Sequence, residues 1–309
     1  MNQKRRGFIK STTLAAAAGL LIPNSVFSSG SAAATVRILV WDERSADQKE
    51  AYGNFLGNYI ADQLKNRSGF SVVSAGLDDA DQGLSEKALE NVDVLIWWGH
   101  QRQSEVLPEK GKYIAQRIIS GSLALIALHS AHWSTPFVEA MNEISIRKVL
   151  TDKSIKLENI NFVKPPEQYT VPEWDARLTP YAMESKFPDG HKKIELHLPY
   201  CCFPAYRNDG KPSTLRVLKH DHPIFKRIPK TFQLPHTEMY NEPFHVPEPD
   251  EVLLEECWAG GEWFRSVMLW QLGKGKVLYF RPGHETFEVY KQRWPLEIIS
   301  NAARWMSAS

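Results

Sequence analysis

The chain has 309 residues, of which 43% are hydrophobic and 24% are charged, and its formal net charge at pH 7 is +1. Residues 1–34 contain four basic residues and no acidic one, so the chain without them carries a net charge of −3. This balance leaves no basic surplus for nucleic acid or an anionic membrane surface, and the remaining length of about 275 residues suffices for one large domain, with or without an insertion.

Residues 1–34 have the features of an export signal. Arg5 and Arg6 precede Phe8, an Ala-rich apolar segment follows, and three alanines at 32–34 suit cleavage. The apolar segment is too short to span a membrane. We therefore predict a twin-arginine signal peptide at 1–34 and a periplasmic domain at 35–309 that has no membrane contact after cleavage. This route carries proteins that are already folded, often with a metal bound.

The export prediction can be tested by replacing Arg5 and Arg6 together with lysine. The double variant is expected to stay in the cytoplasm, because recognition depends on the guanidinium pair, which lysine does not reproduce. Cell fractionation measures the result. A normal periplasmic yield of the double variant would contradict the assignment.

The first half of the domain alternates strands and helices. Apolar runs predict strands at 36–41, 70–73, 92–98 and 125–128. Apolar residues at helical spacing predict helices at 46–65, 84–89, 109–120 and from 137 onward. Four such alternations indicate parallel strands joined by right-handed crossovers. We predict an α/β fold with a flavodoxin-like, doubly wound and mostly parallel sheet.

The second half departs from this rhythm. Eight prolines exclude a long helix between residues 151 and 219, and we interpret this region as a β-rich insertion that forms a lid. Beyond it, Gly260 and Gly261 separate two strands as in a hairpin. A last strand at 276–281 and an amphipathic helix that includes Leu296 and Trp305 complete the domain.

Polar side chains follow four of the predicted parallel strands. They are Asp42 and Glu43, His100, His129 and His132, and His284 and Glu285. The segment between the last strands adds Glu238, Tyr240 and Glu242. Carboxyl ends of parallel strands share one edge of the sheet, so these groups are expected to converge there.

Histidine and glutamate side chains that converge in this way suit Zn²⁺ or a similar ion with one open position. A metal-free alternative is an acid/base pair of His284 with Glu238 or Glu285. A Ser130–His284–acid triad ranks last, because the residues around Ser130 lack the glycines that flank a nucleophile elbow.

Five short motifs resemble the ThuA-like (trehalose utilisation) family. They stand at 97–100, 128–132, 238–240, 264–266 and 280–286, and the resemblance covers 36–150 and 220–307. It implies a fold similar to class I glutamine amidotransferases, with His129 where those enzymes have cysteine, so amidotransferase chemistry is not implied. It also implies disaccharide or glycoside catabolism on 3-keto sugars made by partner dehydrogenases, with zinc in some members. The export signal and the 151–219 insertion depart from shorter members.

These observations lead to one assignment of the site. We expect one Zn²⁺ ion held by His129, His132, Glu238 and His284, with His100 replacing one of these ligands as the competing assignment. Its affinity should fall as the pH drops through roughly 6.5, because imidazole must be unprotonated to bind. The catalytic residues are then His129, Glu238, His284 and Glu285. The substrate contacts are Asp42, His100, Ser130, Tyr240, Glu242 and Arg281.

The expected function is that of an exported, metal-dependent hydrolase, lyase or isomerase acting on a small-molecule keto sugar. The alternative is a non-catalytic periplasmic sugar-binding protein whose histidines bind hydroxyl groups. The sequence leaves open the sugar, the bond, a homo-oligomeric state and the disulfide state of Cys201, Cys202 and Cys257.

Overall fold

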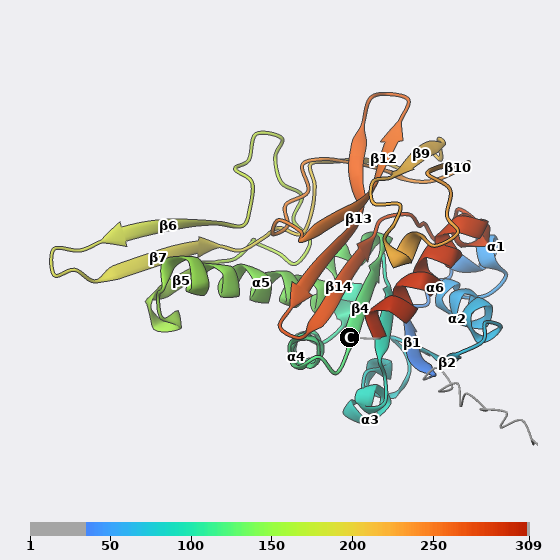
Figure 1. The fold of residues 1–309 in the computed structure, drawn as a ribbon, viewed down its shortest axis with the longest axis horizontal. Coiled ribbons are helices and arrows are strands. Elements are labelled where there is room, and N and C mark those ends of the chain that lie inside the picture. Colours follow the sequence, from blue (N-terminus) through green and yellow to red (C-terminus); the bar gives the residue numbers. More distant parts are fainter. Residues whose placement is uncertain (1–34, 308–309) are drawn as a thin grey trace, which may run out of the picture. The chain divides into compact units, whose positions relative to one another are not determined.

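One nine-stranded sheet organises residues 35–307, the part of the chain that the computed structural model describes (Figure 1). The predicted signal peptide lies outside these residues. The strand order is β10-β9-β12-β13-β14-β4-β3-β1-β2. The strands are β1 (Val36–Asp42), β2 (Phe70–Gly76), β3 (Val94–Trp98), β4 (Ala124–Leu128), β9 (Ser213–Val217), β10 (Thr231–Leu234), β12 (Glu251–Trp258), β13 (Trp263–Leu272) and β14 (Gly275–Phe280).

The half of the sheet from β2 to β14 is parallel. Its order, β2-β1-β3-β4-β14, is the order of flavodoxin-like sheets. The strands β3 and β4 are buried along their whole length, as expected for uninterrupted apolar runs covered on both faces. The described part of the chain contains no helix long and apolar enough to cross a membrane.

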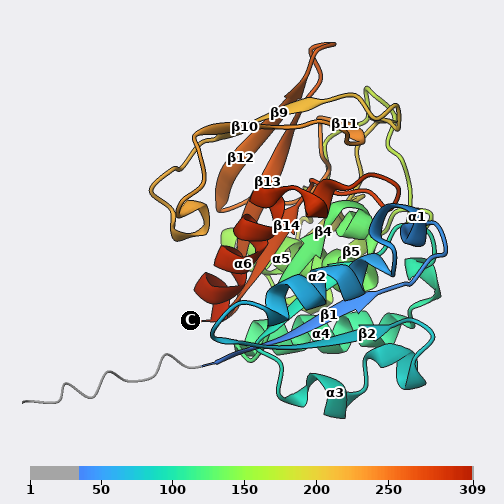
Figure 2. The same cartoon turned by 90° about the vertical axis from the view of Figure 1, so that its right-hand side faces the viewer.

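Helices cover both faces of this parallel half (Figures 1 and 2). One face packs against α1 (Gln48–Tyr52), α2 (Leu56–Lys65) and α6 (Arg293–Ser307). The other packs against α3 (Glu86–Glu90), α4 (Pro108–Ser120) and α5 (Thr135–Lys153). Alternate residues of β1 supply the two cores, because successive side chains of a strand point to opposite faces.

The other half of the sheet is antiparallel, so the prediction of a mostly parallel sheet holds for one half only. Four strand pairs of the nine-stranded sheet in the described chain are parallel and four are antiparallel. The predicted hairpin is present, since β12 and β13 pair across Gly261, whose φ is +91°. Short turns of this kind can join only antiparallel strands, because a parallel pair needs a crossover of a dozen or more residues.

The region 151–219 does not form a single insertion. The strands β5 (Ile160–Val163), β6 (Tyr181–Lys186) and β7 (Lys192–His197) build a small separate sheet, which Figure 1 shows extending away from the large one. This sheet has its own apolar cluster around Ile194 and Leu196. However, β9 is a strand of the main sheet, so the predicted boundary at 219 is too late.

The carboxyl ends of four neighbouring parallel strands lie side by side. Direct partners in the ladder are Asp42 with Trp98, Trp98 with Leu128, and Leu128 with Phe280. The segments that follow β1, β3, β4 and β14 therefore begin at the same edge of the sheet. The short strands β8 (Ala205–Arg207) and β11 (Met239–Asn241), which pair with each other, bring in the segment that carries Glu238.

Candidate active site

His129 occupies a sharp turn directly after β4. Its backbone has φ +51°, in the left-handed region that non-glycine residues seldom adopt. Gly283 makes room for this turn, because a Cβ on Gly283 would lie 2.7 Å from the His129 Cβ. Strained backbone of this kind persists where the surroundings enforce it, and it concentrates at functional sites.

The His129 ring is held from both faces and at one nitrogen. It is stacked between Trp98, at 5.6 Å between ring centroids, and Tyr240, at 5.0 Å. Its Nδ1–H donates to the Arg281 carbonyl at 3.0 Å. The lone pair of the neutral ring is therefore on Nε2, which lies 3.2 Å from the Tyr240 hydroxyl and 3.0 Å from Glu238 Oε2.

His100 and Glu285 form a second fixed unit. His100 Nδ1 lies in hydrogen-bond contact with the Glu285 carboxylate, which leaves its Nε2 free. Burial alone would raise the pKa of Glu285, but the bond and charge of His100 outweigh it and lower that pKa to about 2. Burial likewise favours neutral His100, yet Glu285 raises its pKa above 6.5.

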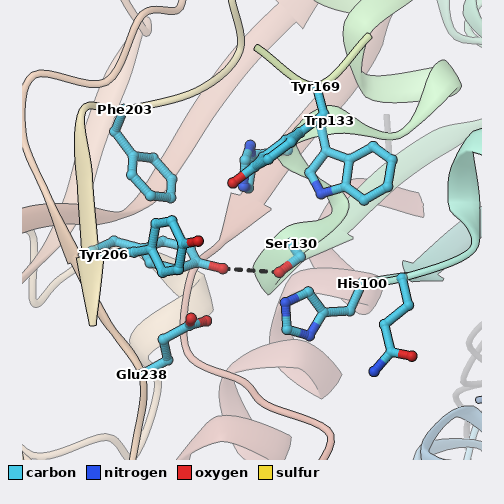
Figure 3. A pocket seen from close by; sticks show the side chains of 10 residues that line it. His100, Ser130, Trp133, Tyr169, Phe203, Tyr206 and Glu238 are labelled. Carbon is cyan, nitrogen blue, oxygen red and sulfur yellow. Dashed lines mark hydrogen bonds between the residues drawn. The ribbon is translucent and has the colours of Figure 1, made fainter. Parts of the chain in front are cut away.

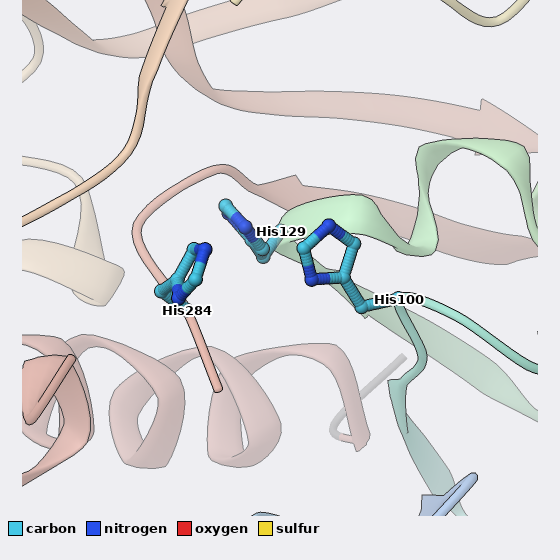
Figure 4. A group of neighbouring side chains, drawn as sticks. All are labelled: His100, His129 and His284. Atoms are coloured by element: carbon cyan, nitrogen blue, oxygen red, sulfur yellow. The ribbon is translucent and has the colours of Figure 1, made fainter. Parts of the chain in front are cut away.

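His284 completes a group of three imidazoles (Figure 4). Its Nδ1 lies 3.1 Å from the Thr286 backbone N–H and 2.9 Å from the Thr286 hydroxyl, and its buried Nε2 has no partner among residues 35–307. Burial lowers the pKa of His284, so the ring is neutral. One nitrogen from each of His100, His129 and His284 lies within 4.8 Å of the others.

The donor set fits a cation. Nitrogens on one tetrahedral Zn²⁺ ion lie about 3.4 Å apart at a bond length of about 2.1 Å, so the three side chains would have to close in by up to about 1.4 Å to bind one. His129 Nε2 and Glu238 Oε2 are both acceptors when His129 is neutral and Glu238 is ionised. Burial drives the pKa of His129 down and that of Glu238 up, so a shared proton or metal ion is required between them.

His132 lies outside this group, contrary to the assignment of His132 as a ligand. Its Nδ1–H donates to the Cys201 carbonyl at 2.5 Å, and its ring packs against Phe203 and Phe244. Burial lowers the pKa of His132 to about 3, which keeps the ring neutral. Among the described residues, His100 takes its place in the imidazole group, as in the competing assignment.

A cavity of about 300 Å³ lies beside the imidazole group (Figure 3). Its polar wall includes His100, Ser130, His132 and Glu238. Its aromatic wall consists of Trp133, Tyr169, Phe203, Tyr206 and Tyr240. The Ser130 hydroxyl bonds the Tyr240 hydroxyl at 2.9 Å, and no described contact joins Ser130 to His284, so the triad is not assembled.

Three residues predicted to touch substrate lie away from this cavity wall. The Asp42 carboxylate accepts three N–H groups, from Arg44, Gln48 and Gly57. Glu242 pairs with Arg265, and Arg281 is fully buried against Glu256. Polar residues at the ends of strands also brace loops and helix starts, and that is the role of these three.

Apart from Tyr240, the residues of the aromatic wall were not predicted from the sequence. Tyr169, Phe203 and Tyr206 come from the region 151–219, where only a lid was expected, and Trp133 follows the His129 turn. The clustering of prolines pointed to an ordered loop, but no periodicity indicated which aromatic residues face the site. The cysteines of this region, Cys201 and Cys202, are buried free thiols, and Cys257 is an exposed one.

Gly283→Ala is expected to abolish metal binding and turnover and to lower stability by about 1–3 kcal/mol, as overpacking does. The added methyl group would lie 2.7 Å from both the His129 Cβ and the Tyr290 hydroxyl, so the His129 turn must move. Gly260→Ala is the control, since this residue is exposed, its φ is not positive, and the atoms nearest to a Cβ there belong to the movable carboxylate end of the Glu262 side chain. Elemental analysis of both variants provides the measurement, and full metal content in Gly283→Ala would contradict the expectation.

Comparison with known proteins agrees with this architecture. The sequence profile described as ThuA, trehalose utilisation, matches residues 37–306. A ThuA-like protein from Bacteroides uniformis has 14% sequence identity and a TM-score of 0.51, with 89% of this chain and 92% of that chain covered. One from Parabacteroides merdae has 13% identity and a TM-score of 0.53, with 88% and 90% covered. At such identities the likeness shows a shared fold. No curated protein matches the chain. Since the profile spans the domain from β1 to α6, the chain belongs to the ThuA (trehalose utilisation) family.

Proposed function

We propose that this chain is an exported enzyme that processes a keto sugar with the help of a divalent metal, most suitably Zn²⁺. One observation carries the proposal. His129 Nε2 and Glu238 Oε2 lie 3.0 Å apart, inside a group in which His100, His129 and His284 each bring a ring nitrogen to within 4.8 Å of the others. A proton on Glu238 would satisfy the His129–Glu238 pair alone, whereas a divalent ion would satisfy the carboxylate and the imidazole group together.

The residues that would hold the ion are His100, His129 and His284, with Glu238 as the carboxylate. His100 and His129 present the arrangement that metal-binding histidines adopt, in which the nitrogen away from the ion donates to a carboxylate or carbonyl. For His284, the Thr286 backbone N–H donates to Nδ1 at 3.1 Å, which places the proton of the neutral ring on Nε2, so ligation through Nε2 would require the loss of this hydrogen bond and a change of tautomer. A bound Zn²⁺ would polarise a substrate carbonyl.

The chain's own side chains would handle protons and orient the sugar. Glu238 is buried at the cavity, and the carboxylate oxygen that does not hold the ion could accept and return a proton. Carbon atoms next to a sugar carbonyl are acidic enough for such a step. His132 offers Nε2 as an acceptor for a substrate hydroxyl, because Nδ1–H is occupied by the Cys201 carbonyl.

The aromatic wall supports a sugar as the substrate. Tyr169 and Tyr206 remain 40% and 55% exposed although both line the cavity. Flat aromatic faces beside a few placed polar groups are typical of binding sites for ligands with apolar C–H faces. The family description, trehalose utilisation, agrees with a saccharide. Export by the twin-arginine route remains part of the proposal, since its signal lies outside the described residues.

The test is turnover of a 3-keto-disaccharide by the purified, metal-loaded chain, followed by product analysis. We expect turnover by the wild type and its loss in Glu238→Gln, which keeps the shape of the side chain but cannot accept a proton as a carboxylate does. Glu143→Gln, the same change on α5 at a residue that does not line the cavity, is the control. Binding of the sugar without turnover across a panel of keto sugars would favour the non-catalytic sugar-binding protein instead.

A further inference from the structure

A second cavity, of about 390 Å³, lies at the opposite edge of the sheet from the candidate active site. Val36 and Phe70, the first residues of β1 and β2, are partners in the ladder, so the loop that leads into β2 belongs to the amino edge of the parallel strands. This loop supplies Arg67 and Ser68 to the cavity wall, and residues 226–227 supply another part. One face of α6 completes the wall with Glu297, Ser300, Asn301 and Arg304.

The wall of this cavity is strongly basic. It carries four cationic side chains, those of Arg67, Lys226, Arg227 and Arg304, and one acidic side chain, that of Glu297. The chain without residues 1–34 has a net charge of −3, so a surplus of three positive charges in one cavity runs against the overall balance. A net charge describes the whole domain, and a local cluster of one sign still attracts ions of the other.

Most N–H donors of these cations have no partner among residues 35–307. The side chains of Lys226 and Arg227 make no hydrogen bond or ion pair there. Arg67 binds Glu297 through Nη1 at 2.7 Å, and Arg304 binds a backbone carbonyl through Nη2 at 2.6 Å. A guanidinium has five N–H donors, so both arginines retain donors for a ligand. Lys226, Arg227 and Arg304 are exposed, so a ligand from solution can reach them.

Hydrogen bonds and contacts to α6 hold the two basic loops in place. The Asn301 Nδ2 donates to two carbonyls of the segment 224–226, at 3.1 and 3.0 Å. Arg227 follows with φ +66°, in the left-handed region that non-glycine residues seldom adopt. On the other loop, a Cβ on Gly69 would lie only 3.0 Å from Arg304 Nη1. The cavity wall is therefore largely preformed, which lowers the cost of binding.

We propose that this cavity is an anion site, which binds one phosphate group through Arg67, Arg227 and Arg304, with Lys226 as a further positive charge. The planar N–H forks of guanidinium groups match the oxygens of phosphate. A carboxylate has only two oxygens to share among three guanidinium groups, whereas a phosphate group on a carrier molecule has three and carries more charge. The inference concerns binding only, and it does not depend on the reaction proposed for the first cavity.

Two kinds of molecule carry such a group, a soluble phosphate compound and a phospholipid. The phospholipid enters the comparison because the chain begins its first strand beside this cavity. The Val36 backbone N–H donates to the Gly69 carbonyl at 3.0 Å, and the predicted export signal precedes Val36 in the sequence. Inorganic phosphate therefore tests the shared chemistry, and vesicles with an anionic phospholipid distinguish the two sources.

The experiment titrates the mature chain with inorganic phosphate in a calorimeter, at constant ionic strength so that general screening does not change. We expect one saturable site. The double variant Arg227→Gln/Arg304→Gln should bind phosphate about tenfold more weakly, because it removes charged hydrogen bonds. Glu297→Gln should bind it more tightly, since the change removes the one acid of the wall and releases Arg67.

Arg216→Gln is the matched control, because Arg216 is an exposed arginine outside this cavity and its variant should bind phosphate as the wild type does. The absence of saturable phosphate binding, or equal affinities of the wild type and the double variant, would overturn the proposal. Weaker binding by Glu297→Gln would contradict it as well.

The source of the phosphate group follows from sedimentation with vesicles of phosphatidylcholine that contain about one third phosphatidylglycerol. Vesicle binding that is lost in the double variant would assign a lipid headgroup, and phosphate binding without vesicle binding would assign a soluble compound. Neither readout involves turnover. Phosphate binding by a protein that processes no keto sugar would refute only the reaction, and turnover without phosphate binding would refute only the anion site.

Discussion

His129→Asn is expected to remove bound metal and turnover while the domain stays folded. Asparagine tolerates the left-handed backbone of this turn better than most residues do, so the change removes the imidazole with little added strain. Loss of an outer hydrogen-bond partner of a metal ligand already costs about 10–100-fold in affinity, and loss of the ligand itself should cost more than about 100-fold. Elemental analysis and a chelator competition measure the effect.

His132→Asn is the matched control for this experiment. His132 comes from the same turn and is as deeply buried, but its Nδ1 binds the Cys201 carbonyl and it lies outside the imidazole group of the described chain. The His132→Asn variant should keep its metal. Its substrate binding should be weaker, and a raised KM would show this. Equal metal loss in both variants would restore His132 as a ligand, and no loss in either would refute the metal site.

Metal occupancy should also depend on pH through His100. Glu285 raises the pKa of His100 above 6.5, whereas burial lowers the pKa values of His129 and His284. On acidification His100 is therefore the first of the three imidazoles to bind a proton, and occupancy should begin to fall above pH 6.5. Glu285→Gln removes the charge that favours protonated His100. In this variant the curve of metal occupancy against pH should therefore move to lower pH. A curve that stays in place would show that His100 is not a ligand.

Arg281→Met is expected to destabilise the domain by about 3–5 kcal/mol, because it leaves the Glu256 charge buried without a counter-ion. Both side chains of this pair are fully buried. The Arg281 guanidinium also donates to the Thr237 hydroxyl and the Glu238 carbonyl, so its loss should displace Glu238 from the site. Urea unfolding and metal content measure the two effects.

An ion pair between the neighbouring strands β9 and β12 supplies the control. Arg216 binds Glu255 through the same chemistry, but its side chain is 66% exposed, so Arg216→Met should have only a small effect on unfolding. The double variant Arg281→Met/Glu256→Met should recover part of the lost stability, since it removes the unpaired charge. Equal urea midpoints for Arg281→Met and Arg216→Met would contradict the importance of the buried pair.

The sequence by itself determined the parallel half of the sheet and the edge at which polar groups gather. Buried strands are uninterrupted apolar runs, helices repeat every 3.6 residues, and parallel strands bring their carboxyl ends together, so local patterns suffice. The shared edge of the parallel strands placed His100, His129, His284 and Glu238 at one site. It also placed Asp42 and Arg281 there, because residue type cannot distinguish a side chain that faces a cavity from one that braces a loop.

Only the tertiary structure decided which histidines meet. His129 and His132 share a turn, but the left-handed backbone of His129 breaks its regular geometry and sends the two rings to different partners, the carbonyls of Arg281 and Cys201. His100 joins the group because β3 lies next to β4, and strand order has no local signal. The aromatic wall and the Arg281–Glu256 pair depend on contacts between distant segments, which packing selects and periodicity does not encode.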